Sequence, residues 1–295
     1  MPATSAGMTR KVIHTTEISM KISLCNEVIA GLSFEKQCDL MAKLGYDGVE
    51  IAPVTLSDEP HLLPAARRRE IKKIAADAGL PITSLHYLMV APKGLSITAK
   101  DPDVRKLTFD VMRGLVQLAA DLGAKLLIHG SPMQRQLEAG DEADSHKRGV
   151  EFFAAAGEAA RAAGVTYLLE PIARNQAAMI NRVEEAVAIV QTIDNPGLKT
   201  MLDCSAAGQS EAQPVADVLA KWLPSGLVAH IHFNDPNRRG PGEGELEFSP
   251  IVATLKSGGY SGIAAIEPFI YEPDGPTCAA RAIGYMRGVI EANGA

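Results

Sequence analysis

The chain of 295 residues contains only four cysteines, Cys25, Cys38, Cys204 and Cys278, and no two of them form a CxxC pair. Four dispersed thiols do not make the dense framework of a disulfide-linked secreted domain. We therefore expect free thiols in a reducing compartment, and the predicted location is cytoplasmic.

Excess basic charge and long apolar runs are also missing. The chain has 29 Lys and Arg against 35 Asp and Glu, a net charge of -6, which argues against a general nucleic-acid binder. No run approaches the roughly 18 apolar residues of a membrane span, and residues 1–20 lack an apolar signal core. We predict small-molecule partners, no nucleic acid and no membrane. Residues 1–19 are expected to be a loose extension before one domain at 20–295.

The sequence does contain eight short β-rich runs that alternate with longer amphipathic segments. Helical patterns at 33–45, 64–79 and 103–123 each end in glycine, the usual left-handed C-cap. Later helical patterns lie at about 149–163, 182–192, 212–223, 249–258 and 276–292. The predicted strands lie at 21–25, 48–52, 81–86, 124–129, 165–170, 198–203, 227–233 and 262–267. Eight such units in one chain of this length predict an α/β fold, a single-domain (β/α)8 TIM barrel.

A doubly wound open sheet would show the same alternation of strands and helices. No GxGxxG follows the first predicted strand, and polar residues stand at or beside the carboxyl ends of the strands rather than at one switch point. These residues are Asn26, Glu50, His86, His129, Glu170, Asp203, His232 and Glu267. Such a ring at one rim favours the closed barrel.

Four members of this ring are good ligands for a divalent cation, namely Glu170, Asp203, His232 and Glu267. Their spacings of 33, 29 and 35 residues are close to the ~31 residues per unit expected when about 250 residues form eight units. The pattern predicts one metal site at the mouth of the barrel. Three carboxylates with one imidazole suit Mn, Mg or Co better than a structural zinc site, although Zn is possible.

Glu170 and Glu267 share a local pattern in which an apolar run is followed by Glu and then Pro. A carboxylate at the end of a strand is unfavourable to bury unless it is paired, hydrogen-bonded or bound to a metal. The alternative is a polar strand end before a Pro-directed turn. A bound cation would polarise a substrate carbonyl or hydroxyl and stabilise an enediolate, while a carboxylate moves the proton.

The segment HIHFNDPNRRGPGEGELEF at 230–248 is the most specific stretch of the chain. His230 and His232 point the same way in an alternating strand, with His232 nearer the rim. The polar loop that follows carries Arg238 and Arg239, which could hold a polyol or a phosphate. A solvated surface loop is the alternative.

Four motifs in this order resemble those of the xylose isomerase-like TIM barrels, a superfamily of sugar isomerases and epimerases. The resemblance runs from Lys21 to about Glu291 and is carried by LLEP at 168–171, MLDCSAAG at 201–208, HIHFNDPNRRGPGEG at 230–244 and AAIEPF at 264–269. Similarity to the D-tagatose 3-epimerase branch implies that Glu170, Asp203, His232 and Glu267 hold the metal. It also implies that Glu170 and Glu267 are the catalytic acid–base pair, one on each face of the substrate carbon.

The same resemblance implies that Arg238 positions substrate oxygens. The chain departs from the branch at Ala206, where those epimerases have His, and at Gln176, where they have Glu. The expected substrate contacts are His86, His129, Gln176, Arg238 and Glu50. For His86 and His129 the alternatives are support of the metal ligands from behind, or a purely structural role.

These features favour a metal-dependent sugar isomerase or epimerase that acts through an enediolate on a small carbohydrate. The departures at Ala206 and Gln176 leave open a lyase, a dehydratase or decarboxylase of a keto-sugar acid. A non-catalytic sugar-binding barrel is a further alternative. His86 and His129 also resemble ligands of the endonuclease IV zinc cluster, but the acidic net charge and Ala206 argue against DNA repair. By analogy we expect a homo-oligomer.

Overall fold

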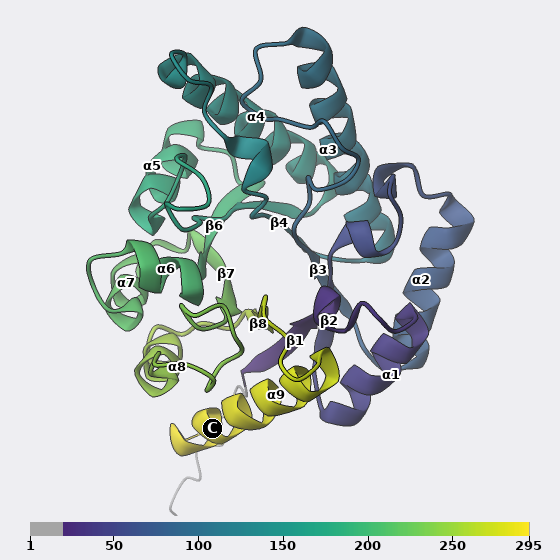
Figure 1. Ribbon diagram of the computed structural model, residues 1–295, viewed down its shortest axis with the longest axis vertical. Coiled ribbons are helices and arrows are strands. Elements are labelled where there is room, and N and C mark those ends of the chain that lie inside the picture. The colour runs from purple at the N-terminus through teal and green to yellow at the C-terminus, as the bar shows by residue number, and fades with distance from the viewer. Residues whose placement is uncertain (1–19, 295) are drawn as a thin grey trace, which may run out of the picture.

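The computed structural model describes residues 20–294 and confirms the closed barrel of eight parallel strands, in which β8 pairs with β1. Figure 1 shows the strands at the centre and the helices around them. Every strand end lies within two residues of its prediction. The strands are β1 (Lys21–Cys25), β2 (Gly48–Ile51), β3 (Ile82–Leu85), β4 (Leu126–His129), β5 (Thr166–Leu169), β6 (Leu198–Asp203), β7 (Val228–Phe233) and β8 (Ile263–Ile266). The predicted extension at 1–19 lies outside the described residues.

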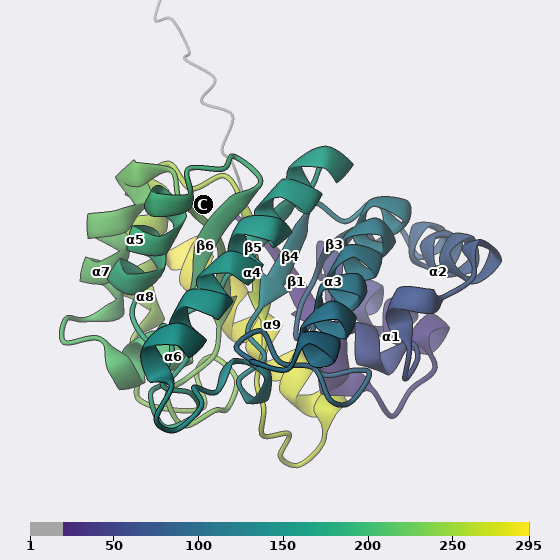
Figure 2. The same cartoon turned by 90° about the horizontal axis from the view of Figure 1, so that it is seen from above.

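Helices follow the strands and form the outer ring of the barrel. Gly45 and Gly123 end α1 and α3 with φ of 84° and 87°, as their sequence positions predict. The helices are α1 (Phe34–Leu44), α2 (Ala65–Asp77), α3 (Pro102–Leu122), α4 (Glu142–Ala163), α5 (Val183–Ile193), α6 (Cys204–Ser210), α7 (Val215–Trp222), α8 (Phe248–Ser257) and α9 (Gly275–Ala292). In the side view of Figure 2, α6 lies at the edge of the barrel where loops leave the strands.

Two helical features differ from the sequence prediction. Helix α4 begins at Glu142 instead of near 149, and Glu142 and Asp144 place negative charge in its first turn, where the helix dipole favours it. The short helix α6 was not predicted. It begins where the Asp203 side chain accepts a hydrogen bond from the Ala206 backbone N–H, which makes Asp203 the N-cap.

The apolar core lies mainly between the strands and the surrounding helices, while a small second cluster of Ile128, Leu168 and Met201 fills part of the barrel interior. The remaining interior is polar below the carboxyl rim, where Glu50, Ser84 and His230 are fully buried. Because side chains alternate along each strand, one face packs against helices and the other enters the barrel. Within residues 20–294, no helix combines the length and apolar character needed to cross a membrane.

Candidate metal centre and active site

The structure brings together the four predicted ligands at the carboxyl rim of β5 to β8. Glu170 directly follows β5, Asp203 ends β6 and lies opposite His232 of β7, and Glu267 directly follows β8. Each side chain offers one ligand atom, and these atoms all lie within 4.8 Å of one another. All four residues are at least 95% buried.

The geometry of the cluster fits a divalent cation. His232 Nδ1 lies 3.7 Å from both Glu170 Oε1 and Asp203 Oδ2, and 2.8 Å from Glu267 Oε2. That shortest contact is not aligned as a hydrogen bond, and His232 Nδ1 and Glu267 Oε2 have no hydrogen-bond partner among the described residues. An unsatisfied buried polar atom costs about 1–3 kcal/mol, so two such atoms that face one centre fit a site that could hold a cation. Three carboxylates and one imidazole are suitable donors for Mn, Mg or Co.

The crowded carboxyl groups have strongly shifted pKa values. Burial, together with the charge of Glu267, raises the pKa of Glu170 to about 8 and that of Asp203 to about 7. Burial acts on Glu267 as well, but His232 and His86 outweigh it and hold the Glu267 pKa at about 2. Without a cation, two of the three carboxyl groups therefore tend to bind protons near neutral pH, and a divalent cation would compete with those protons.

Backbone, amide and guanidinium groups hold three of the four predicted ligands in place. Asp203 accepts hydrogen bonds from the Ala206 backbone N–H and from Asn234 Nδ2, both at 2.6 Å. Asn234 Nδ2 also donates to the carbonyl oxygen of Glu267 at 3.0 Å, so one buried amide connects two ligands. Arg135 donates to the carbonyl oxygen of Glu170 at 2.7 Å. The sequence placed Asn234 only in a polar loop, and its contact with Asp203 was not anticipated.

His86 reaches the centre through Glu267 and does not line the pocket. Its Nδ1 lies 2.9 Å from Glu267 Oε1, and its Nε2 lies 2.8 Å from Glu27 Oε2. Burial alone would lower the pKa of His86, but the surrounding carboxylates raise it well above its usual value. The ring therefore bridges two carboxylates, one of them a predicted ligand. The part played by Glu27 was not anticipated from the sequence.

A pocket of about 80 Å³ opens over the cluster, and both Gln176 and Arg238 line it. Arg238 has a left-handed backbone, with φ of 69°, and its guanidinium lies over the Phe269 ring at 5.0 Å from the centroid. Backbone hydrogen bonds from Phe269 and Ile270 to the Arg238 carbonyl hold this conformation. The lining residues also include Gly130 and Gln209, for which the sequence suggested no role.

Two other expected substrate contacts lie away from this pocket. His129 points out of the barrel, where Nδ1 is 2.8 Å from the Tyr167 hydroxyl and the ring packs edge-on against Phe152 and Phe153 of α4. Its neighbour Ile128 occupies the interior instead, as strand alternation requires. Glu50 does point inward, but it is fully buried below the rim and contacts His232 Nε2 at 2.8 Å.

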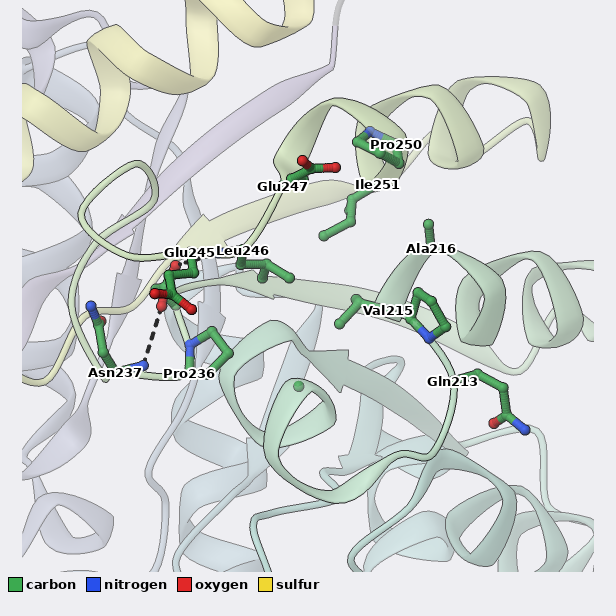
Figure 3. Close-up of a pocket in the computed structure, with 13 residues that line it drawn as sticks. Gln213, Val215, Ala216, Pro236, Asn237, Glu245, Leu246, Glu247, Pro250 and Ile251 are labelled. Carbon is green, nitrogen blue, oxygen red and sulfur yellow. Dashed lines mark hydrogen bonds between the residues drawn. The ribbon is translucent and has the colours of Figure 1, made fainter.

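A larger hollow of about 660 Å³ lies outside the barrel mouth, between α7, α8 and the loop that follows β7. Figure 3 shows Val215, Leu246 and Ile251 directed into it. None of its lining residues belongs to a group of potential metal ligands found within residues 20–294. The smaller pocket over Glu170 and Glu267 is therefore the candidate active site.

Comparison with known proteins agrees with this architecture. The chain is 27% identical to D-psicose 3-epimerase of Ruminiclostridium cellulolyticum over 234 residues, which cover 78% of this chain and 76% of that protein. It is 26% identical to D-psicose 3-epimerase of Agrobacterium fabrum over 245 residues, with 80% of each chain covered.

Solved structures show the same fold. D-psicose 3-epimerase with D-tagatose from Clostridium cellulolyticum H10 superposes with a TM-score of 0.79 at 22% identity, covering 92% of this chain and 99% of that one. The apo form of 3-keto-D-glucoside 4-epimerase from E. coli superposes with a TM-score of 0.76 at 20% identity, covering 91% and 99%. The sequence profile of the xylose isomerase-like TIM barrel matches residues 38–289. The chain therefore belongs to the xylose isomerase-like TIM barrel family.

Proposed function

We propose that this protein is a divalent-metal-dependent epimerase of a ketose, acting at C3 through an enediolate. The observation that carries the proposal is the convergence of Glu170, Asp203, His232 and Glu267 within 4.8 Å beneath a small pocket. The names of its relatives support the choice of substrate and carbon, since they include D-psicose 3-epimerases and L-ribulose 3-epimerase. Mn, Mg or Co is the proposed cation, with Zn possible.

When bound, the cation would supply Lewis-acid polarisation of the substrate oxygens beside the reacting carbon. Glu170 and Glu267 come from β5 and β8, and both carboxyl groups line the pocket. We assign them the two proton transfers, in which one carboxylate accepts the C3 proton from one face and the other carboxyl donates a proton to the opposite face. The reverse reaction exchanges their roles, so the configuration at C3 inverts without loss of atoms.

The remaining pocket groups would orient the sugar. Arg238 offers a planar set of donors that the stacked Phe269 ring keeps in place. Gln176, Ser205 and Gln209 add hydrogen-bonding groups that suit sugar hydroxyls. Enclosure of both reacting carboxyl groups, at most 5% exposed, limits access of water to the enediolate.

A lyase that acts on a keto-sugar acid through the same enediolate is the second candidate. It is favoured by Ala206 and Gln176, which both line the pocket and differ from the epimerase pattern. Ala206 and Gln176 would change the contacts available to the substrate, while the proposed cation ligands are retained.

The test is incubation of metal-stripped protein with ketoses and keto-sugar acids, separately with Mn, Mg, Co or Zn. Chromatography and NMR identify the products. Appearance of the C3 epimer with an unchanged mass supports the proposal. Loss of water or carbon dioxide supports the lyase, whereas sugar binding without turnover under every condition supports a binding barrel. The homo-oligomer and the cytoplasmic location stay predictions.

A further inference from the structure

The two nitrogens of the His232 ring face different surroundings. Nδ1 faces the three carboxylates of the proposed cation site, at 2.8 to 3.7 Å. Nε2 lies 2.8 Å from Glu50 Oε1 on the side away from the pocket. A carboxylate can only accept a hydrogen bond, so a neutral ring facing Glu50 carries its proton on Nε2 and leaves the Nδ1 lone pair for the cation.

Glu50 is in turn held from several directions. Its Oε2 accepts a short hydrogen bond from the Ser84 hydroxyl and lies 2.9 Å from His230 Nε2, a close contact that is not aligned as a hydrogen bond. Cys25 Sγ donates to Oε1 at 3.3 Å. The carboxylate is fully buried and does not line the pocket, so a substrate contact does not account for it. A buried carboxylate needs such partners to remain charged.

His230 and His232 lie two residues apart on β7 and face the same side, with ring centroids 5.1 Å apart and an angle of 85° between the rings. Glu50 therefore lies between two imidazoles, of which only His232 belongs to the cation cluster. His230 restricts where the Glu50 carboxylate lies. Glu50 in turn determines which nitrogen of the His232 ring faces the cluster.

We propose that Glu50 is a positioning residue that fixes the His232 tautomer for cation binding through Nδ1, and that His230 and Ser84 hold Glu50 in place. The proposal rests on the proposed cation site. Partners of this kind behind a metal ligand typically contribute 10- to 100-fold in metal affinity. We therefore expect metal affinity to fall by a similar factor when the Glu50 acceptor is removed, while the residues that line the pocket stay unchanged.

Two variants of Glu50 distinguish the effect of its hydrogen-bond acceptor from the effect of its negative charge. Glu50→Gln keeps an oxygen that can accept from His232, whereas Glu50→Leu removes the acceptor. We expect Glu50→Leu to weaken Mn²⁺ binding about 10- to 100-fold by calorimetry on stripped protein, and to change the visible spectrum of the Co²⁺-loaded protein. Glu50→Gln should retain most of the affinity and the spectrum. Tyr46→Phe removes a buried hydrogen bond to the Ala279 carbonyl and is the control for lost stability alone.

Histidine ¹⁵N NMR on the Mg²⁺-loaded wild-type protein reads the tautomer directly and does not depend on a variant that folds. We expect His232 to carry its proton on Nε2. Any of three results would overturn the role of Glu50. They are a proton on His232 Nδ1, an equal loss of Mn²⁺ affinity in both Glu50 variants, and an unchanged Mn²⁺ affinity in folded Glu50→Leu. A wild-type protein that binds none of the cations would refute the cation site, and with it the proposed function. Cation binding with the expected tautomer but no sugar turnover would support this inference and count against the proposed function alone.

Discussion

Replacement of Gly130 by alanine would displace Glu170 without removing any ligand. A Cβ built on Gly130 would lie 1.7 Å from Glu170 Oε2 and 2.7 Å from Glu170 Cδ. Side-chain carbons do not approach other heavy atoms closer than 3.0 Å, so Oε2 must move by at least the difference, about 1.3 Å. The Glu170 carboxylate would therefore leave its place in the cluster.

A displacement of about 1 Å in a reacting group can reduce the rate about 100-fold. We therefore expect Gly130→Ala to lower kcat for ketose epimerisation about 100-fold at saturating Mn²⁺, and to weaken Mn²⁺ binding about tenfold. Chromatography of the two epimers measures the rate, and calorimetry on stripped protein measures the affinity. Thermal unfolding reports whether the barrel is intact.

Gly31→Ala is the matched control, because a Cβ at Gly31 would meet no atom within 4 Å. Neither Gly31 nor Gly130 has a positive φ, so backbone strain does not confuse the comparison. Wild-type turnover in folded Gly130→Ala would refute the assignment of Glu170 as a reacting carboxylate at this position.

Three further predictions address groups around the centre. Arg238→Lys should raise KM about tenfold with little change in Mn²⁺ affinity, because lysine lacks the planar donor set that stacks on Phe269; steady-state kinetics and calorimetry check this. His129→Asn should lower the free energy of unfolding by about 1–3 kcal/mol in urea titration and leave KM unchanged, since the ring contacts Tyr167 and not the pocket; a raised KM in the folded variant would contradict the placement. The metal-free protein should lose thermal stability as pH rises from about 5 to 8, because Glu170 and Asp203, with pKa values of about 8 and 7, bind more protons in the folded state than in the unfolded state. Calorimetric scans should show a smaller loss with Mn²⁺ present, and stability that rises over this range in the metal-free protein would contradict the assigned shifts.

The strands and the convergence of the four proposed ligands could be predicted from the sequence, because each of these residues stands at or beside the end of an apolar run. Glu170 and Glu267 immediately follow β5 and β8, and Asp203 is the last residue of β6. Parallel strands that end at one rim bring such residues together whatever the details of helix packing. The predicted ligand set therefore followed from chain order alone.

The direction and depth of side chains were harder to predict. In a parallel barrel both faces of a strand are buried and apolar, so the run LLIH at 126–129 does not show which residues face inward. The structure places Ile128 inside and His129 outside. Glu50 lies below the rim because depth depends on strand stagger, which local sequence does not specify.

Contacts between residues far apart in the sequence could not be predicted from the sequence either. Asn234 supports Asp203 from 31 positions away, and Glu27 meets His86 from 59 positions away. Helix α6 was missed because its seven residues carry no clear amphipathic pattern and its start depends on the Asp203 cap.

The most direct test of the central claim is deuterium exchange into a ketose in D₂O. The ketose is incubated with metal-stripped or Mn²⁺-reconstituted protein, and NMR of the sugar measures the exchange. We predict that the reconstituted protein incorporates one deuterium at C3 of both epimers, and that the stripped protein does not. Glu267→Gln with Mn²⁺ should reduce the incorporation by orders of magnitude because a proton carrier is lost. Equal exchange in stripped and reconstituted protein, or no exchange at any carbon with any of the four cations, would contradict a metal-dependent ketose epimerase.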